Sequence, residues 1–300
     1  WRFIFHFSFF KTVILYFQTE TDLSRNGIRP IDLFQQKIES GFRHFMKTMN
    51  TAIVTGASSG LGREFFRAIV AYYPELDDIW IIARRKDRLE ALAAETTGRK
   101  VRVLPLDLTN EDDIAAYAAL LKQEKPPVRL LINNAGAGTI GNVWELDYLR
   151  QGQSVSLNCR SMVEVSALTV PYMTAGSSII NTCSIAAFVP TPRMTTYSAT
   201  KAFVYAFSKG LRFELKSKKI NCLAVCPCPM ETEFLEAGNI PGRSKTFDSL
   251  PRCNPTKVAK TSLKKAFAGR GIYTPKAFYK FYRFIAKALP HGFVMHMSKL

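Results

Sequence analysis

From residue 51 onward, short apolar runs alternate with longer stretches in which apolar residues recur at helical spacing. Most of the short runs are rich in β-branched residues and bounded by Gly, Pro or Asn, as strands are. They predict seven strands, at 51–55, 79–83, 101–104, 129–132, 178–182, 220–225 and 271–273. Strands that alternate with helices are typical of βαβ units. We therefore expect an α/β fold, with a single Rossmann-type doubly wound parallel sheet of about seven strands and helices on both faces.

Length and composition favour one large domain with appendages. A chain of 300 residues that is 47% hydrophobic can bury a full core, and no shift in composition divides residues 50–270. We expect the α/β domain to span 49–274. Within it, a polar stretch with Gly and Pro at 233–254 is placed as a lid over the carboxyl edge of the sheet.

The first 48 residues do not fit this pattern. Their opening is crowded with aromatics but carries Arg2, His6 and Lys11, which suits a membrane-spanning helix of ~20 apolar residues poorly. Residues 1–48 are an extension, an anchor or sequence from outside the native protein, and we leave them out of the fold prediction.

The positive charge is concentrated near the carboxyl terminus. The formal net charge is +17, and residues 256–300 hold ten Lys or Arg with no Asp or Glu. Thr274 and Pro275 predict the N-cap and first position of a basic amphipathic helix that ends by Leu289, within a segment at 275–300. Such a helix covers a core, roofs an apolar pocket or rests on an anionic lipid surface. Its expected apolar face is Phe278, Phe281, Tyr282, Ile285 and Leu289, and its basic face is Lys276, Lys280, Arg283 and Lys287.

The six cysteines show no spacing of a secreted disulfide framework, so we interpret them as buried thiols in a reducing compartment, consistent with a cytoplasmic protein. Cys226 and Cys228 lie far in sequence from every His, so no metal site is predicted.

A glycine-rich loop follows the first strand. In the run Thr55 to Gly62, Gly56 permits a tight turn, Gly60 lets the backbone approach a pyrophosphate, and Gly62 lets the next helix pack closely. Ser58, Ser59 and Leu61 belong to the same loop. A strand, glycines and then a helix is the context in which such a loop binds a dinucleotide phosphate.

The second strand ends without the acidic residue that would bind a ribose 2′-hydroxyl. Arg84 and Arg85 stand there instead. A guanidinium matches a 2′-phosphate, so NADP(H) is favoured over NAD(H), with Arg84 the first candidate and Arg85 the second.

Tyr197 and Lys201 are four residues apart on a helix predicted at 196–215, so they project from one face. Ser184 lies at the carboxyl end of the fifth strand, thirteen residues before Tyr197. A second Tyr-x-x-x-Lys match, Tyr205 with Lys209, has Pro192 at that distance and lacks the hydroxyl. Reducing a ketone requires a proton at oxygen. We expect the ammonium of Lys201 to lower the pKa of the Tyr197 phenol, which then serves as general acid and base.

With these motifs the chain resembles the classical short-chain dehydrogenase/reductase family over about residues 50–235. The resemblance also rests on Asp107 in Leu106–Thr109, on Asn133-Asn-Ala-Gly136 and on Asn158. It implies that Asp107, with Leu108 beside it, lines the adenine pocket, and that Asn158 joins a water chain to Lys201. It also implies that Asn133 steadies the sheet and that Asn134, Ala135 and Gly136 line the cofactor cleft. Pro227 and Thr232 are similar to the family's nicotinamide-binding segment, although Cys228 replaces its usual glycine.

These features predict an NADP(H)-dependent oxidoreductase that interconverts a secondary alcohol and a ketone. The basic tail loosely resembles that of hydroxysteroid and long-chain 3-ketoacyl reductases, which favours a bulky hydrophobic, steroid-like substrate, with a 3-ketoacyl or other lipid carbonyl as the alternative. A cofactor-binding regulatory protein without turnover is the rival from another class. The family implies a homodimer or homotetramer. Peripheral membrane contact through the basic helix is one of the alternatives given for it above, and no base-reading motif supports nucleic-acid binding.

Overall fold

The computed structural model describes residues 51–238 and 248–297. The expectations for 1–48, and for the middle of the 233–254 lid, concern residues outside these ranges. The division of the chain into segments therefore stays a prediction.

The described residues contain one sheet of seven parallel strands in the order β3-β2-β1-β4-β5-β6-β7. This confirms the predicted fold class. The chain turns back at β1, where the next βαβ unit is added on the other side, and a ligand crevice forms at such a switch point. The strands are β1 (Thr51–Thr55), β2 (Asp78–Ile82), β3 (Lys100–Leu104), β4 (Val128–Asn133), β5 (Met173–Thr182), β6 (Asn221–Val225) and β7 (Ile272–Tyr273).

The largest departure from the predicted strands is the start of β5. It begins at Met173 rather than at residue 178, because Met173 still pairs with Val128 before the register shifts to Leu130 opposite Ser178. The segment in between carries polar and small residues, so it lacks the apolar pattern that marks the rest of the strand.

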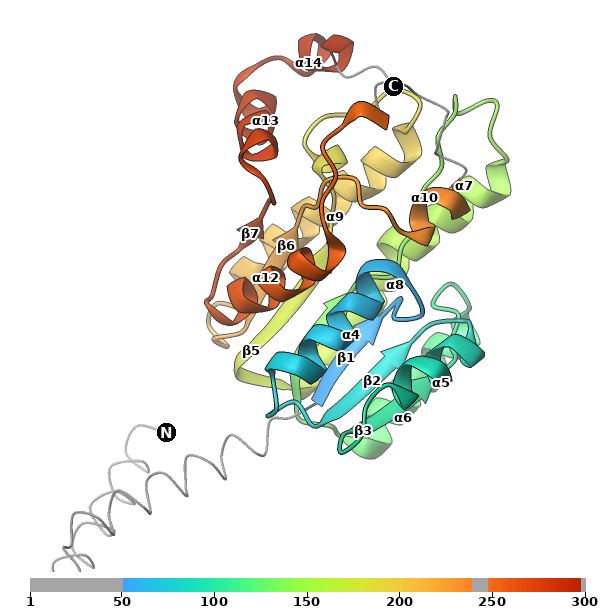
Figure 1. Cartoon of the computed structure of the whole chain (residues 1–300), viewed down its shortest axis with the longest axis vertical. Helices are drawn as coiled ribbons and strands as arrows, with labels where there is room; N and C mark the ends of the chain where they lie inside the picture. The colour runs from blue at the N-terminus through green and yellow to red at the C-terminus, as the bar shows by residue number, and fades with distance from the viewer. Residues whose placement is uncertain (1–50, 239–247, 298–300) are drawn as a thin grey trace, which may run out of the picture. The chain divides into compact units, whose positions relative to one another are not determined.

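Helices cover both faces of the sheet, and alternate strand residues supply the two cores. Val54 packs with α4, α5 and α12 in one cluster, whereas Ile53 packs with α6, α8 and α9 in the other. Figure 1 shows α12 lying beside α4 on one face. The helices are α4 (Gly60–Tyr72), α5 (Lys86–Ala94), α6 (Glu111–Glu124), α7 (Tyr148–Val155), α8 (Ser161–Thr169), α9 (Thr195–Glu214), α10 (Glu233–Ala237), α12 (Pro255–Phe267), α13 (Ala277–Ala288) and α14 (His291–Met297).

The basic amphipathic helix is present as α13, but its beginning and its faces differ from the prediction. It starts at Ala277, because Lys276 has a left-handed φ of 57° and so stands outside the helix. The side chains that it buries are Tyr279 and Ala286, whereas Phe281 and Phe284 are each 65% exposed. The predicted apolar face is therefore split between the interior and the surface. Among the described residues, every helix is too short or too polar to cross a bilayer.

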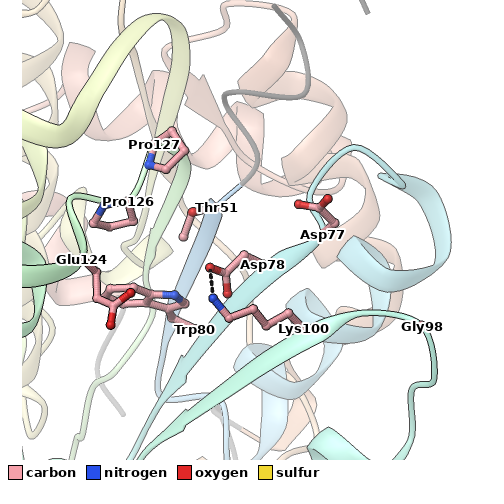
Figure 2. Close-up of a pocket in the computed structure, with 9 residues that line it drawn as sticks. All are labelled: Thr51, Asp77, Asp78, Trp80, Gly98, Lys100, Glu124, Pro126 and Pro127. Atoms are coloured by element: carbon pink, nitrogen blue, oxygen red, sulfur yellow. Dashed lines mark hydrogen bonds and ion pairs between the residues drawn. The ribbon is translucent and has the colours of Figure 1, made fainter. Parts of the chain in front are cut away.

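A cavity of about 420 Å³ lies at the amino ends of the strands, the edge opposite the predicted site (Figure 2). Lys100 and Asp78 form an ion pair of 3.1 Å on its wall. Within the described part of the chain, Thr51 Oγ1, Asp78 Oδ1 and Trp80 Nε1 have no hydrogen-bond partner there. Such polar atoms suit ordered water, for which the cavity has room.

Candidate active site

A cavity of about 820 Å³ opens at the carboxyl edge of the sheet, where doubly wound folds bind ligands. Its wall contains the glycine loop, residues at the ends of β2, β4, β5 and β6, and Tyr197 and Lys201 of α9. Nearly every predicted site residue lines it: Gly56, Ser58, Ser59, Gly60, Leu61, Arg84, Arg85, Asp107, Leu108, Asn134, Ala135, Gly136, Ser184, Tyr197, Lys201, Pro227 and Thr232. Two predicted residues, Gly62 and Asn158, do not.

The glycine loop has the geometry of a phosphate cradle. Gly56 has a φ of 66°, and a Cβ there would lie 2.8 Å from the Cα of Ala135. A Cβ on Gly62 would lie 2.1 Å from the carbonyl oxygen of Gly56, so only glycine lets α4 begin this close to the turn. The amino end of α4 thus faces the cavity with free backbone N–H groups, and these residues fit a dinucleotide pyrophosphate.

The segment after β4 is fixed by side chains of its neighbours. The backbone N–H groups of Asn134 and Ala135 both donate to Thr55 Oγ1, at 2.9 and 3.0 Å. The buried Asn133 side chain donates to Asn181 Oδ1 and to Ser166 Oγ, both at 2.9 Å. The segment is thereby held against β1 and β5, as the family resemblance implies.

The three residues of the sequence motif meet at one wall of this cavity. Tyr197 and Lys201 lie one turn apart on α9, and Ser184 is the second residue after β5. Ser184 Oγ accepts from the backbone N–H of Ala186 at 3.1 Å. The Lys201 ammonium donates to the carbonyl oxygen of Thr182 at 2.9 Å and lies 5.7 Å from the centroid of the Tyr197 ring.

The protonation of Tyr197 differs from the sequence expectation. Burial raises its pKa to about 12, and interaction with the Ser184 side chain only partly opposes this. Lys201 does not lower the pKa here, because its ammonium is directed to Thr182 and burial lowers the pKa of Lys201 itself. A folded-state pKa above the ordinary value of ~10 means that the phenol keeps its proton at neutral pH. Tyr197 therefore carries a proton that it could donate in this arrangement.

Asn158 lies in a π-helical turn, η2 (Ser156–Arg160), between α7 and α8. Its side chain accepts from the backbone N–H of Ala137 at 2.9 Å, and donates to the Ala137 carbonyl at 2.8 Å and to Thr200 Oγ1 at 2.9 Å. Asn158 thus ties the segment after β4 to α9 next to Lys201. Its part in a water chain stays a prediction.

The two arginines after β2 have different surroundings. Arg84 is 3.7 Å from Asp107 Oδ2, and its side chain is 74% exposed. Partial burial disfavours the Asp107 carboxylate, but hydrogen bonds from Thr109 and the charge of Arg84 outweigh it and lower its pKa. Arg85 instead donates to Ser58 Oγ in the glycine loop at 3.0 Å and to Glu233 Oε2 at 2.9 Å.

The segment after β6 accommodates Cys228 without strain. This residue is not among those with positive φ, so the glycine that it replaces is not needed at this point. Thr232 lies over the glycine loop, since a Cβ on Gly60 would be 3.2 Å from the Thr232 Cβ.

Cys228 also forms a disulfide with Cys253, which corrects the expectation of six separate thiols. The two residues are 25 positions apart, a separation without any sequence signal for pairing. Cys228 and Cys253 therefore do not support a reducing compartment. The cytoplasmic location stays a prediction.

Sequence reasoning missed several residues of the cavity. Phe234 on α10 packs on Tyr197, with ring centroids 5.6 Å apart, and Val294 on α14 reaches the wall from the carboxyl terminus. Arg88 forms an ion pair with Glu233. The spacing of Arg88 three residues after Arg85 on a helix could have indicated a shared face. Its acidic partner is 145 residues away and had no such signal.

A dinucleotide cradle that opens onto a Ser, Tyr and Lys cluster defines an oxidoreductase that uses a nicotinamide dinucleotide. Comparison with known proteins supports this class of enzyme. The family profile described as short chain dehydrogenase matches residues 50–240. Human 17-beta-hydroxysteroid dehydrogenase type 3 is 31% identical over 222 residues, which cover 69% of this chain and 67% of that protein.

Solved structures of dehydrogenases are also similar to this chain. A short-chain dehydrogenase from Sphingobium yanoikuyae in complex with NADPH has a TM-score of 0.66 and 27% identity, over 80% of this chain and 96% of that one. The bulky-bulky ketone specific alcohol dehydrogenase from Comamonas testosteroni has a TM-score of 0.65 and 26% identity, over 83% and 94%. The chain belongs to the short-chain dehydrogenase family and is an NAD(P)-dependent oxidoreductase.

Proposed function

We propose that this protein interconverts a secondary alcohol and a ketone on a bulky hydrophobic molecule, with NADP(H) as its cofactor. One observation carries the proposal: the cavity that Ser184 and Tyr197 line also has many apolar side chains in its wall. These include Ile185, Met194, Phe234, Leu235, Leu250, Tyr282, Ile285 and Val294. Apolar walls around a few polar groups are typical of sites for hydrophobic ligands.

The chemistry divides between cofactor and protein. When bound, the nicotinamide supplies a hydride to the ketone carbon or accepts one from the alcohol carbon. Ser184 would hydrogen-bond the substrate oxygen and hold it beside Tyr197. In reduction, Tyr197 would donate its phenolic proton to that oxygen, and in oxidation it would take the proton back. Once turned from the Thr182 carbonyl toward the phenol oxygen, the Lys201 ammonium would stabilise the phenolate that remains after donation.

The preference for NADP(H) rests on charge at the end of β2. Arg84, Arg85 and Arg88 follow this strand, and the strand ends in apolar residues rather than in an acid. Arg85 contacts the glycine loop through Ser58, which puts a guanidinium next to the place where a pyrophosphate and its adenosine ribose would lie. A planar guanidinium suits a 2′-phosphate.

The substrate class can be tested by following NADPH oxidation with panels of steroid ketones, 3-ketoacyl thioesters and small polar ketones. The names of the two relatives given above refer to a hydroxysteroid and to bulky ketones, which favours the first panel. We expect turnover to rise with the apolar size of the ketone. Faster turnover of acyl substrates would select the lipid carbonyl alternative, and tight NADPH binding without turnover of any panel would support a regulatory protein.

We also propose that α13 touches an anionic membrane surface. Phe281 and Phe284 project from it at 65% exposure, and Lys280 and Lys287 are exposed on the same helix. Exposed aromatics next to lysines bind to anionic lipid headgroups. This position would suit a protein whose apolar substrate partitions into lipid.

The membrane contact predicts a measurable difference in vesicle binding. The parent protein should co-sediment with phosphatidylserine vesicles, and the double variant Phe281→Ser/Phe284→Ser should lose most of this co-sedimentation. Trp144→Ser, which removes an aromatic that is 82% exposed outside α13, should keep it. Equal binding of all three proteins, or equal binding to phosphatidylcholine vesicles, would refute the contact.

We further propose a homodimer or homotetramer. Leu149 and Val155 on α7, and Phe203 and Phe213 on α9, are large apolar side chains that are 43–81% exposed. Neighbouring helices with such side chains provide an apolar face for a second copy. Light scattering should give a mass of two or four chains, and a monomer at micromolar concentration would contradict this.

A further inference from the structure

Glu233 joins the lid helix α10 to the arginines that follow β2. Its Oε2 accepts from Arg85 Nη1 at 2.9 Å, and its Oε1 pairs with Arg88. Both carboxylate oxygens are therefore held by guanidinium groups. The hydrogen bond from Arg85 is the main reason why the pKa of Glu233 is lowered, so Glu233 is ionised at neutral pH.

The Glu233 carboxylate binds Arg85, the guanidinium that we propose for the 2′-phosphate of the cofactor. Arg85 contacts Ser58 of the glycine loop with its other terminal nitrogen, so its guanidinium spans the gap between that loop and α10. A 2′-phosphate on the same guanidinium would stand beside the Glu233 carboxylate, and two anions at such a distance repel each other. The exposed fraction of the Glu233 side chain, 40%, leaves the carboxylate free to move away into solvent.

Movement of Glu233 would change the packing around Tyr197. Glu233 is the first residue of α10, and the next residue, Phe234, packs its ring on Tyr197 at 5.6 Å between centroids. A Cβ on Gly138 would lie 2.6 Å from the Tyr197 ring and 2.9 Å from the Phe234 ring, so these groups are closely packed. While Glu233 is held by the arginines, Phe234 stays packed against the Tyr197 ring.

We propose that Glu233 is an internal competitor for the 2′-phosphate of NADP(H). In this proposal, Arg85 exchanges the carboxylate for the phosphate, which frees the start of α10 and lets Phe234 leave Tyr197 so that substrate can approach. NADH, which has no 2′-phosphate, would leave Glu233 on Arg85. The inference rests on the NADP(H) preference proposed above. It makes Glu233 the residue through which the bound cofactor controls whether substrate reaches Tyr197.

Binding measurements on Glu233→Gln test the competition directly. The amide keeps the shape of the side chain and removes its charge. We expect the dissociation constants of NADPH and of 2′-AMP to fall about three- to fivefold, the range that loss of an exposed ion pair of up to ~1 kcal/mol allows. NADH and 5′-AMP should change less than about twofold, since neither carries a 2′-phosphate. Glu236→Gln, on an exposed carboxylate of the same helix, is the matched control and should change none of them.

The outcomes separate this inference from the cofactor preference. If NADPH and 2′-AMP bind Glu233→Gln no more tightly than they bind the parent protein, Glu233 does not compete. If the parent protein binds NADPH no better than NADH, the proposed preference fails, but tighter binding of 2′-AMP to Glu233→Gln would still establish the competition.

Hydrogen exchange tests the link to α10. In the parent protein, the amides of residues 233–238 should exchange faster when NADPH is saturating than when NADH is. In Glu233→Gln this difference between the cofactors should disappear. Equal exchange with both cofactors in the parent protein would overturn the proposed release of Phe234.

Discussion

Tyr197→Phe is expected to lower turnover by about 10²- to 10⁴-fold, the usual contribution of a positioned general acid. The variant keeps the aromatic ring, and so keeps the packing on Phe234, but it has no proton to give to the substrate oxygen. Because the phenol oxygen is not part of the glycine cradle, NADPH affinity should stay within about threefold of the parent value. Steady-state rates and cofactor titration by fluorescence measure the two effects separately.

The second Tyr-x-x-x-Lys match provides the control for this prediction. Tyr205 lies on the same helix and packs on Phe188, and its buried hydroxyl has no hydrogen-bond partner in the part of the chain that the structure describes. Removing an unpaired buried hydroxyl costs little stability. Tyr205→Phe should therefore keep full turnover, and a greater loss in Tyr205→Phe than in Tyr197→Phe would show that the proton donor is misassigned.

Arg85→Ala is expected to weaken NADPH binding by about 10- to 100-fold, since a hydrogen bond to a charged group contributes ~1.5–3 kcal/mol. Arg84→Ala should have a smaller effect, because the Arg84 side chain is 74% exposed and its charge is directed to Asp107. This reverses the order of the two residues expected from sequence. Calorimetric titration with NADPH and NADH measures both variants.

NADH is the internal control for the arginine prediction. Its affinity for Arg85→Ala should change less than about threefold, because the substitution removes a partner of the 2′-phosphate and leaves the glycine loop intact. An equal loss for both cofactors would mean that Arg85 supports the loop through Ser58 rather than binding a phosphate. A larger loss in Arg84→Ala would restore the original order.

Much of the site was predictable because its chemistry is local in sequence. The turn at Gly56, the one-turn spacing of Tyr197 and Lys201, and the position of Ser184 at a strand end follow from backbone geometry over a few residues. Parallel strands bring their carboxyl ends to one edge, so these local motifs had to meet once the strands were assigned.

Side-chain pKa values and ion-pair partners were less predictable, because they depend on the positions of side chains in the folded protein. Spacing placed Lys201 on the same face as Tyr197, but it did not show that the ammonium is held by Thr182 or that burial raises the phenol pKa. Burial is a property of the whole packed site. The same limit applies to the ranking of Arg84 and Arg85, since the partners that distinguish them come from separate parts of the chain.

The sequence by itself determined the α/β class, the dinucleotide loop and the candidate acid/base residues, because each depends on periodicity or spacing within one or two neighbouring elements. The tertiary structure decided the contacts between residues that are far apart in sequence. These are the Cys228–Cys253 bridge, the contact of Phe234 with Tyr197, and the ion pair of Arg85 with Glu233, 148 positions away. It also decided that α13 leaves Phe281 and Phe284 in solvent. Helical periodicity defines an apolar face, but only packing decides which part of that face is covered.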